Sequence, residues 1–229
     1  MSTADQYTIL PATATDAKSM RAVSKRANAP NLLHQAFYPK HLAHLTPQEE
    51  LDEWQLNTVI QRLDEGEAIY HKAVLTKDPD RLVGFSGWFP PGALSKSSDS
   101  KTTQAGGETD DENRTPKRPP HFNPAARDNA VRDEYSTQLK LWQEKIWGES
   151  EDYWYVCAMI VDPAFERKGI ARRLLAEGLK LVDQSHKPVY LESTPQGRGF
   201  YERLGFEVKG EFGMCGGEHV VTLFVRDAL

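Results

Sequence analysis

The chain has 229 residues and a formal net charge of −5, from 28 Lys and Arg against 33 Asp and Glu. That length can bury a sizeable core in one domain or in two small ones. An acidic balance gives no overall attraction to nucleic acid or to an anionic membrane, so we expect neither as a partner.

No stretch of the sequence approaches the roughly 18 apolar residues that a membrane-spanning helix needs. Residues 1–10 also lack a basic region followed by an apolar run, which is the pattern of a secretion signal. The two cysteines, Cys157 and Cys215, have no metal-ligand spacing and cannot form a disulfide framework. We therefore expect a cytoplasmic protein with reduced thiols.

The N-terminal part predicts a strand followed by two helices. Tyr7 to Leu10 has strand composition, and Thr13 to Asp16 supplies acceptors that can cap a helix reaching about Ala27. Thr46-Pro47-Gln48-Glu49 is a capping box with proline at the first helical position, which predicts a helix to about Asp64. Three histidines lie between these helices: His34, His41 and His44. Their spacing matches no recognised metal site and no carboxylate stands among them, so we predict no metal and expect a segment that walls a substrate cleft.

The middle of the chain predicts a hairpin, an insertion and a third helix. Ala68 to Leu75 and Arg81 to Phe89 have strand composition, with a tight turn expected at Lys77-Asp78-Pro79-Asp80. Residues at about 92–120 are almost free of apolar side chains, so they cannot bury enough surface to offset their ordering entropy. We expect a disordered insertion there, with regulatory docking or phosphorylation as the alternative. Helical character resumes over about 124–147.

The stretch from Tyr153 to Arg173 contains the most informative pattern. Its first part, Tyr153 to Val161, is almost entirely apolar, which predicts a strand covered on both faces. The strand breaks at Asp162-Pro163, and apolar residues at helical spacing begin after Gly169. A glycine and several basic residues thus meet at a helix N-terminus, where free N–H groups and the helix dipole favour an anion. The segment predicts a pyrophosphate cradle, and the alternative is an ordinary strand-to-helix connection with solvated basic residues.

A second segment, Val189 to Phe206, contains a short strand, a break with Pro and Gly, and a short helix. Together the two segments resemble the GNAT superfamily of acetyl-CoA-dependent N-acetyltransferases. The matching motifs are Val161-Asp162-Pro163, Glu166-Arg167-Lys168-Gly169-Ile170-Ala171 and Tyr201-Glu202-Arg203-Leu204-Gly205-Phe206. One departure is Glu166, which stands where the family usually has Arg or Gln.

The resemblance implies an α/β fold with a mixed, mostly antiparallel central sheet flanked by helices. It implies a single domain over residues 1–229, with the disordered insertion and the helix at 124–147 inserted into it. The sheet is expected to splay at Val161 to admit the cofactor. Its last two strands are expected at Glu207 to Phe212 and at Val220 to Val225, where strand composition resumes.

The resemblance also implies acetyl-CoA as cosubstrate. One run of residues would hold its pyrophosphate: Arg167, Lys168, Gly169, Ile170, Ala171 and Arg172. Arg173 adds a further cation to the same turn. The pantetheine arm would contact the backbone of Met159 and Val161, where a loosened strand leaves the reacting carbonyl in an oxyanion position.

Two side chains are candidates for catalysis. Tyr201 falls on the family's tyrosine that protonates the leaving thiolate, and its alternative is a core tyrosine with a satisfied hydroxyl. An attacking amine must first lose a proton, and Glu192 is the nearest acid to the motifs. Glu192 could instead face solvent or pair with Arg198, and a water chain could take the proton. Histone-acetylating members have a glutamate where this chain has Tyr155.

The sequence therefore predicts an N-acetyltransferase that moves the acetyl group of acetyl-CoA to a primary amine by direct attack in a ternary complex. Its partners would be acetyl-CoA and an amine acceptor, in a monomer or homodimer, and the net charge mildly suits a cationic acceptor. A non-catalytic acyl-CoA-binding or sensing module is the first alternative. A nucleotide-binding fold is the second, although the loop lacks the GxGxxG and GxxxxGK[ST] patterns.

Overall fold

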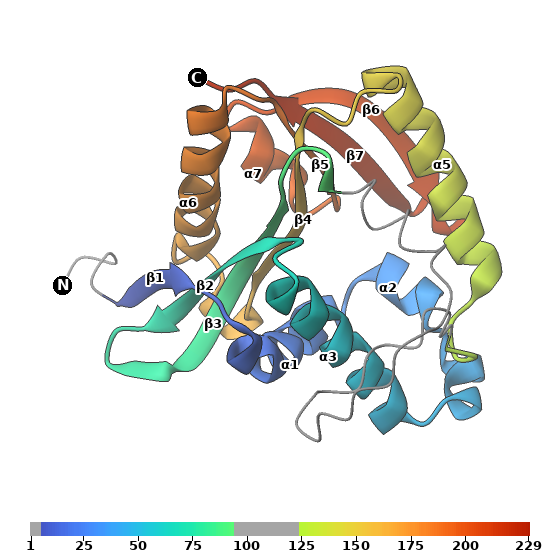
Figure 1. Ribbon diagram of the computed structural model, residues 1–229. Helices are drawn as coiled ribbons and strands as arrows, with labels where there is room; N and C mark the ends of the chain where they lie inside the picture. The colour runs from blue at the N-terminus through green and yellow to red at the C-terminus, as the bar shows by residue number, and fades with distance from the viewer. Residues whose placement is uncertain (1–5, 94–123) are drawn as a thin grey trace, which may run out of the picture.

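The computed structural model describes residues 6–93 and 124–229. The insertion predicted at about 92–120 lies outside the described residues except for Gly92 and Ala93. The two described ranges share one sheet and its covering helices (Figure 1).

One seven-stranded sheet runs through the described part of the chain, in the order β1-β2-β3-β4-β5-β7-β6. Its strands are β1 Tyr7–Pro11, β2 Ile69–Leu75, β3 Asp78–Phe89, β4 Trp154–Val161, β5 Val189–Ser193, β6 Glu207–Met214 and β7 His219–Arg226. Neighbouring strands are antiparallel except β4 and β5, which run parallel. The expected α/β fold with a mixed, mostly antiparallel sheet is confirmed.

Helices cover both faces of this sheet (Figure 1). They are α1 Ala17–Asn28, α2 Leu32–Phe37, α3 Gln48–Asp64, α5 Asn129–Trp147, α6 Ile170–Ser185 and α7 Arg198–Glu202. We call the side covered by α6 and α7 the α6 face, and the side covered by α1, α2, α3 and α5 the α1 face. Side chains alternate between the faces along the end of β3, since Trp88 packs in a cluster with α6, whereas Phe85 and Phe89 pack with α1.

The α6 face is closely packed because α6 presents one apolar stripe to the sheet. Its buried residues are Ile170, Leu174, Leu175, Gly178 and Val182. Gly178 allows the closest approach, since a Cβ built there would lie 1.9 Å from the ring of Trp88. Trp88 is fully buried, so the glycine determines how near the helix can come.

The predicted capping box at Thr46 is wrong. The helix α3 begins at Gln48, with Pro47 as its N-cap and no side-chain cap. The Thr46 hydroxyl instead accepts a hydrogen bond of 3.0 Å from the N–H of Ala126. A partner 80 residues away in sequence took the hydroxyl that the local pattern assigned to the helix.

Two further boundaries differ from the predicted ones. Leu75 pairs directly with Asp78, so the hairpin turn is shorter than expected and Asp78 begins β3. The helix α5 begins at Asn129 rather than at 124, because the Asp128 carboxylate accepts hydrogen bonds from two N–H groups of the first turn.

Candidate functional site

The two parallel strands at the centre of the sheet diverge almost at once. Their register holds only for Trp154 with Val189 and for Tyr155 with Tyr190. Beyond Tyr155, β4 continues along β3 while β5 continues along β7. The strands therefore open a gap in the middle of the sheet, and the predicted opening at Val161 is wrong in position because the divergence begins much nearer the start of β4.

Backbone groups of β4 line this gap. The N–H of Asp162 bonds to the Val83 carbonyl on β3 at 2.8 Å. Because the direction of backbone groups alternates along a strand, those of Met159 and Val161 point away from β3 and into the gap. A bulge at Cys157 shifts the register of β4 against β3 just before these residues. The backbone groups of Met159 and Val161 thus face the opening between β4 and β5.

The loop that follows β4 exposes consecutive backbone N–H groups. Its backbone has positive φ at Arg167 (61°) and at Gly169 (80°), and α6 starts directly after it. The first bond that closes onto this helix runs from the Arg173 N–H to the Gly169 carbonyl at 3.2 Å. The N–H groups of residues 167–172 have no partner among the described residues. This is the arrangement of an anion-binding nest at a helix N-terminus.

The basic side chains of the loop have different surroundings. Arg167 and Arg172 are exposed and form no ion pair with any described residue. Lys168 lies with its Nζ 4.6 Å from the centre of the Phe165 ring. Arg173 turns away from the loop, since its Nη1 donates to the carbonyl of Tyr7 at 2.9 Å. Of the four predicted cations, Arg173 therefore has a structural partner on β1.

Tyr7 supports the loop from the first strand of the chain. Its hydroxyl donates a hydrogen bond of 2.8 Å to the Lys168 carbonyl. A Cβ built on Gly169 would meet the same hydroxyl at 3.3 Å. Glycine at 169 is thus needed both for its positive φ and for the space beside Tyr7.

Glu192 projects from β5 on the α1 face, beside the gap. Its Oε2 accepts a hydrogen bond of 2.7 Å from the Tyr155 hydroxyl. Its Oε1 is buried and has no hydrogen-bond partner in the described part of the chain. Burial raises the pKa of Glu192, and the hydrogen bond from Tyr155 opposes that rise. The predicted alternative of a pair with Arg198 is wrong, because Arg198 binds Glu202 at 2.9 Å and also pairs with Glu211.

Tyr201 lies on the other face of the sheet. It packs on α7 among aromatic rings, with Phe206 at 5.5 Å and Phe224 at 5.7 Å between ring centres, and only 7% of it is exposed. Burial raises the pKa of its phenol. Its hydroxyl forms no hydrogen bond with a described residue, so the alternative of a satisfied core hydroxyl is not what the structure describes. Leu191 shares its cluster, whereas Glu192 points to the opposite side.

Sequence reasoning missed the role of Tyr155 and a cavity on the α1 face. The sequence marks Tyr155 only as the residue at the place of the family's glutamate, whereas in the structure its hydroxyl holds the candidate base. The available signal was the alternation of Tyr153 with Tyr155 and of Tyr190 with Glu192, which places all four on one face. The cavity, of about 310 Å³, lies between α1, α2, α3 and β3 and is lined by Arg21 and Arg62 among others. Its lining residues come from segments that are distant in the sequence, so no sequence motif predicts the cavity.

The histidines do not assemble a metal site in the described part of the chain, where no group of three or more His, Cys, Asp or Glu could hold an ion. His34 on α2 lines the cavity instead, and burial, together with the charge of Arg21, lowers its pKa. The described helices include none that is long and apolar enough to cross a membrane. Cys157 and Cys215 are both free.

Comparison with known proteins identifies relatives of this architecture. A model of the acetyltransferase (GNAT) domain matches residues 119–224. The crystal structure of a histone acetyltransferase HPA2 and related acetyltransferase from Corynebacterium glutamicum aligns with a TM-score of 0.58 and 17% identity, covering 98% of this chain and 97% of that one. NAA60 from Arabidopsis thaliana, solved with a bisubstrate analogue, aligns with a TM-score of 0.51 and 14% identity over 97% and 98%. NAA60 has also been solved with acetyl-CoA.

Proposed function

We propose, from the premise that this chain belongs to the GNAT acetyltransferase family, that it transfers the acetyl group of acetyl-CoA to a primary amine by direct attack in a ternary complex. The observation that carries the proposal is the gap between β4 and β5. A carboxylate borders it on one face of the sheet and a buried phenol lies on the other. An acceptor and a leaving group on opposite sides of the gap would each meet a group suited to move a proton.

The residues present fit the cofactor. The free N–H groups of 167–172 suit a pyrophosphate, and Arg167 and Arg172 add charge that no described carboxylate neutralises. A side chain at Gly169 would crowd the nest against Tyr7. Acetyl-CoA, when bound, supplies an activated acetyl thioester. We assign the pantetheine arm to the backbone of Met159 and Val161, which faces the gap.

Side chains and backbone groups of the protein then each carry out one part of the reaction. Glu192 takes a proton from the amine on the α1 face, and its raised pKa makes it a stronger base than an exposed glutamate. Tyr155 holds that carboxylate in position. Backbone N–H groups of β4 that face the gap stabilise negative charge on the carbonyl oxygen. Tyr201 gives a proton to the departing sulfur on the α6 face.

The experiment is free-thiol release from acetyl-CoA across a panel of primary amines, for wild type and for Glu192→Gln. Gln keeps the size of the side chain but cannot accept the proton, so we expect kcat to fall by about 10² to 10⁴. Wild-type kcat/KM should rise with pH through the raised pKa of Glu192, because the base acts only when ionised. The variant should lose that dependence.

Two results would overturn the proposal. If Glu192→Gln matches the wild type in rate and pH profile, a water chain takes the proton and Glu192 is structural. If the wild type binds acetyl-CoA, measured by calorimetry, but transfers nothing to any amine, the chain is an acyl-CoA-binding or sensing module.

A further inference from the structure

The cavity on the α1 face has the size and lining of a small-ligand site. Its volume of about 310 Å³ is at the lower end of the range for small-ligand sites, about 300–1,000 Å³. Met20, Val59 and Phe85 give it apolar walls, and polar groups come from Ser24, Asn28 and His34. Two arginines also line it, and their surroundings differ.

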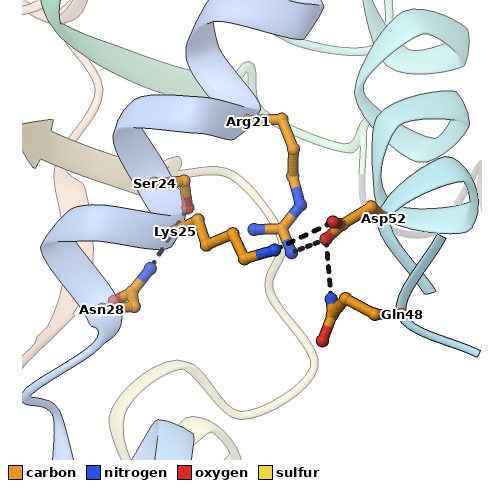
Figure 2. Close-up of polar contacts among 6 residues, drawn as sticks. All are labelled: Arg21, Ser24, Lys25, Asn28, Gln48 and Asp52. Atoms are coloured by element: carbon orange, nitrogen blue, oxygen red, sulfur yellow. Dashed lines mark hydrogen bonds and ion pairs between the residues drawn. The ribbon is translucent and has the colours of Figure 1, made fainter.

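Arg21 already has a carboxylate partner. Its Nη2 pairs with Asp52 Oδ1 at 2.6 Å, and Lys25 and Gln48 converge on the same carboxylate at 3.0 Å each (Figure 2). A negatively charged ligand at Arg21 would have to compete with Asp52. Arg21 therefore needs an anion less than a guanidinium without a carboxylate partner does.

Arg62 has no such partner. No carboxylate of the described residues lies within 4 Å of its guanidinium, although the side chain is half-buried. The nearby Glu67 feels the charge of Arg62 without forming an ion pair with it. The described partners of Arg62 are the Tyr70 side chain and the face of the Phe89 ring, neither of which carries a formal negative charge. An anion in the cavity would supply the counter-ion that this partly buried cation lacks among the described residues.

A series of aromatic contacts leads from Arg62 to the candidate base. Its guanidinium carbon is 5.2 Å from the centre of the Phe89 ring, and Phe89 stacks on Tyr155 at 6.2 Å. Tyr155 in turn donates its hydrogen bond to Glu192. The Arg62 guanidinium, which has no described carboxylate partner, and the candidate base Glu192 thus contact the same pair of stacked rings, Phe89 and Tyr155.

We infer that the acceptor is a small amine that also bears a carboxylate, with Arg62 binding the carboxylate while the amine faces Glu192. The inference rests on the proposed function for the role of Glu192. Guanidinium matches carboxylate with two parallel hydrogen bonds, so an amino acid with an apolar side chain satisfies Arg62 and the cavity walls together. The acidic net charge favours a cationic acceptor, but the local positive charge at Arg62 decides the class.

The test compares amino acids with their carboxamides as acceptors, in wild type and in Arg62→Gln. We expect wild type to favour the acid over the amide by about 10- to 100-fold in kcat/KM, the effect of a hydrogen bond to a charged group. Arg62→Gln should abolish that preference and Arg62→Lys should keep part of it. The ratio between variants cancels the intrinsic difference in amine pKa between acid and amide. Arg132→Gln, which removes an exposed arginine on α5, should leave the preference unchanged.

Calorimetric titration of the same amino acids separates this inference from the proposed function. If no amine is acetylated but the acids still bind in an Arg62-dependent way, the anion site stands and the transferase proposal falls. If amines are acetylated and Arg62→Gln leaves the acid-to-amide ratio unchanged, the transferase stands and the anion site falls. If neither acetylation nor binding depends on Arg62, this inference is wrong. Where Arg62→Gln does lose the preference, a folded Arg62→Lys that keeps part of it excludes misfolding as the cause.

Discussion

The two faces of the sheet differ in how their buried groups are satisfied. On the α6 face the helix packs against fully buried apolar residues, with Trp88 seated against Gly178. On the α1 face, buried polar atoms lack partners in the described chain, among them Glu192 Oε1, the Tyr190 hydroxyl and Arg21 Nε. Each such atom costs about 1–3 kcal/mol. The difference teaches that both faces bury apolar clusters, whereas the α1 face also holds several buried polar atoms that a ligand could pair.

In the proposed reaction the leaving thiolate lies on the α6 face, next to Tyr201. The Tyr201→Phe variant tests this position and should have the largest effect. The variant keeps the ring packing but removes the hydroxyl, so the single-turnover rate should fall by about 10² to 10⁴. Affinity for CoA should not change, because the ring contacts remain. An active wild type whose Phe variant has the same chemical rate over a pH series would make Tyr201 a structural residue.

The next effect concerns the anion-binding nest at residues 167–172. Gly169→Val places a β-branched residue at φ 80° beside Tyr7 and should abolish stabilisation by CoA. For the wild type that stabilisation is about 2.7 kcal/mol at a CoA concentration of 100 Kd, measured by thermal unfolding. Gly66→Val is the matched control, since its φ is 66° and no atom lies within 4 Å of the added Cβ. The nest assignment fails if CoA stabilises both variants equally.

A smaller effect should separate the packing of the two faces. Gly178→Ala forces a Cβ into the ring of fully buried Trp88, and we expect a loss of about 1–3 kcal/mol in the free energy of unfolding. Gly210→Ala, on β6, meets Trp142 of α5 at 2.4 Å, but Trp142 is only partly buried and can move. Its loss should be the smaller one in urea unfolding. Equal losses would mean that the faces are packed alike.

The smallest expected effect concerns the position of the base. Tyr155→Phe removes the hydrogen bond that favours ionised Glu192, so its already raised pKa should rise further. The rising limb of the pH–rate profile should then move to higher pH, with little change in the limiting rate. A limb that stays in place would show that another group titrates there.

The sequence was sufficient where function depends on neighbours in the chain. The helix N-terminus with Gly169 and the buried strand before it follow from local pattern and spacing, and the structure has both. The order of strands and helices followed for the same reason. The predicted helix boundaries were wrong where a residue distant in the sequence bound the capping side chain, as the Ala126 N–H binds the Thr46 hydroxyl.

The α1 face could not be predicted because its groups meet only in three dimensions. Tyr155 and Glu192 are 37 residues apart, and their contact depends on where β4 and β5 part. Arg62 looks like an ordinary solvated residue of α3 in the sequence. Only the folded chain reveals that no described carboxylate neutralises it.

The short pairing of β4 with β5 has a mechanical consequence. In the described sheet, only two backbone-paired residue pairs join β1–β4 to the other three strands, so the sheet consists of two plates whose seam has few backbone hydrogen bonds and is bridged mainly by side chains packed with α6. A small rocking of one plate against the other changes the width of the opening while breaking few backbone hydrogen bonds. A molecule held by Val161 on one plate and by β5 on the other would lock the seam. Amide hydrogen exchange should then slow on both plates at once, although the molecule touches only their edges.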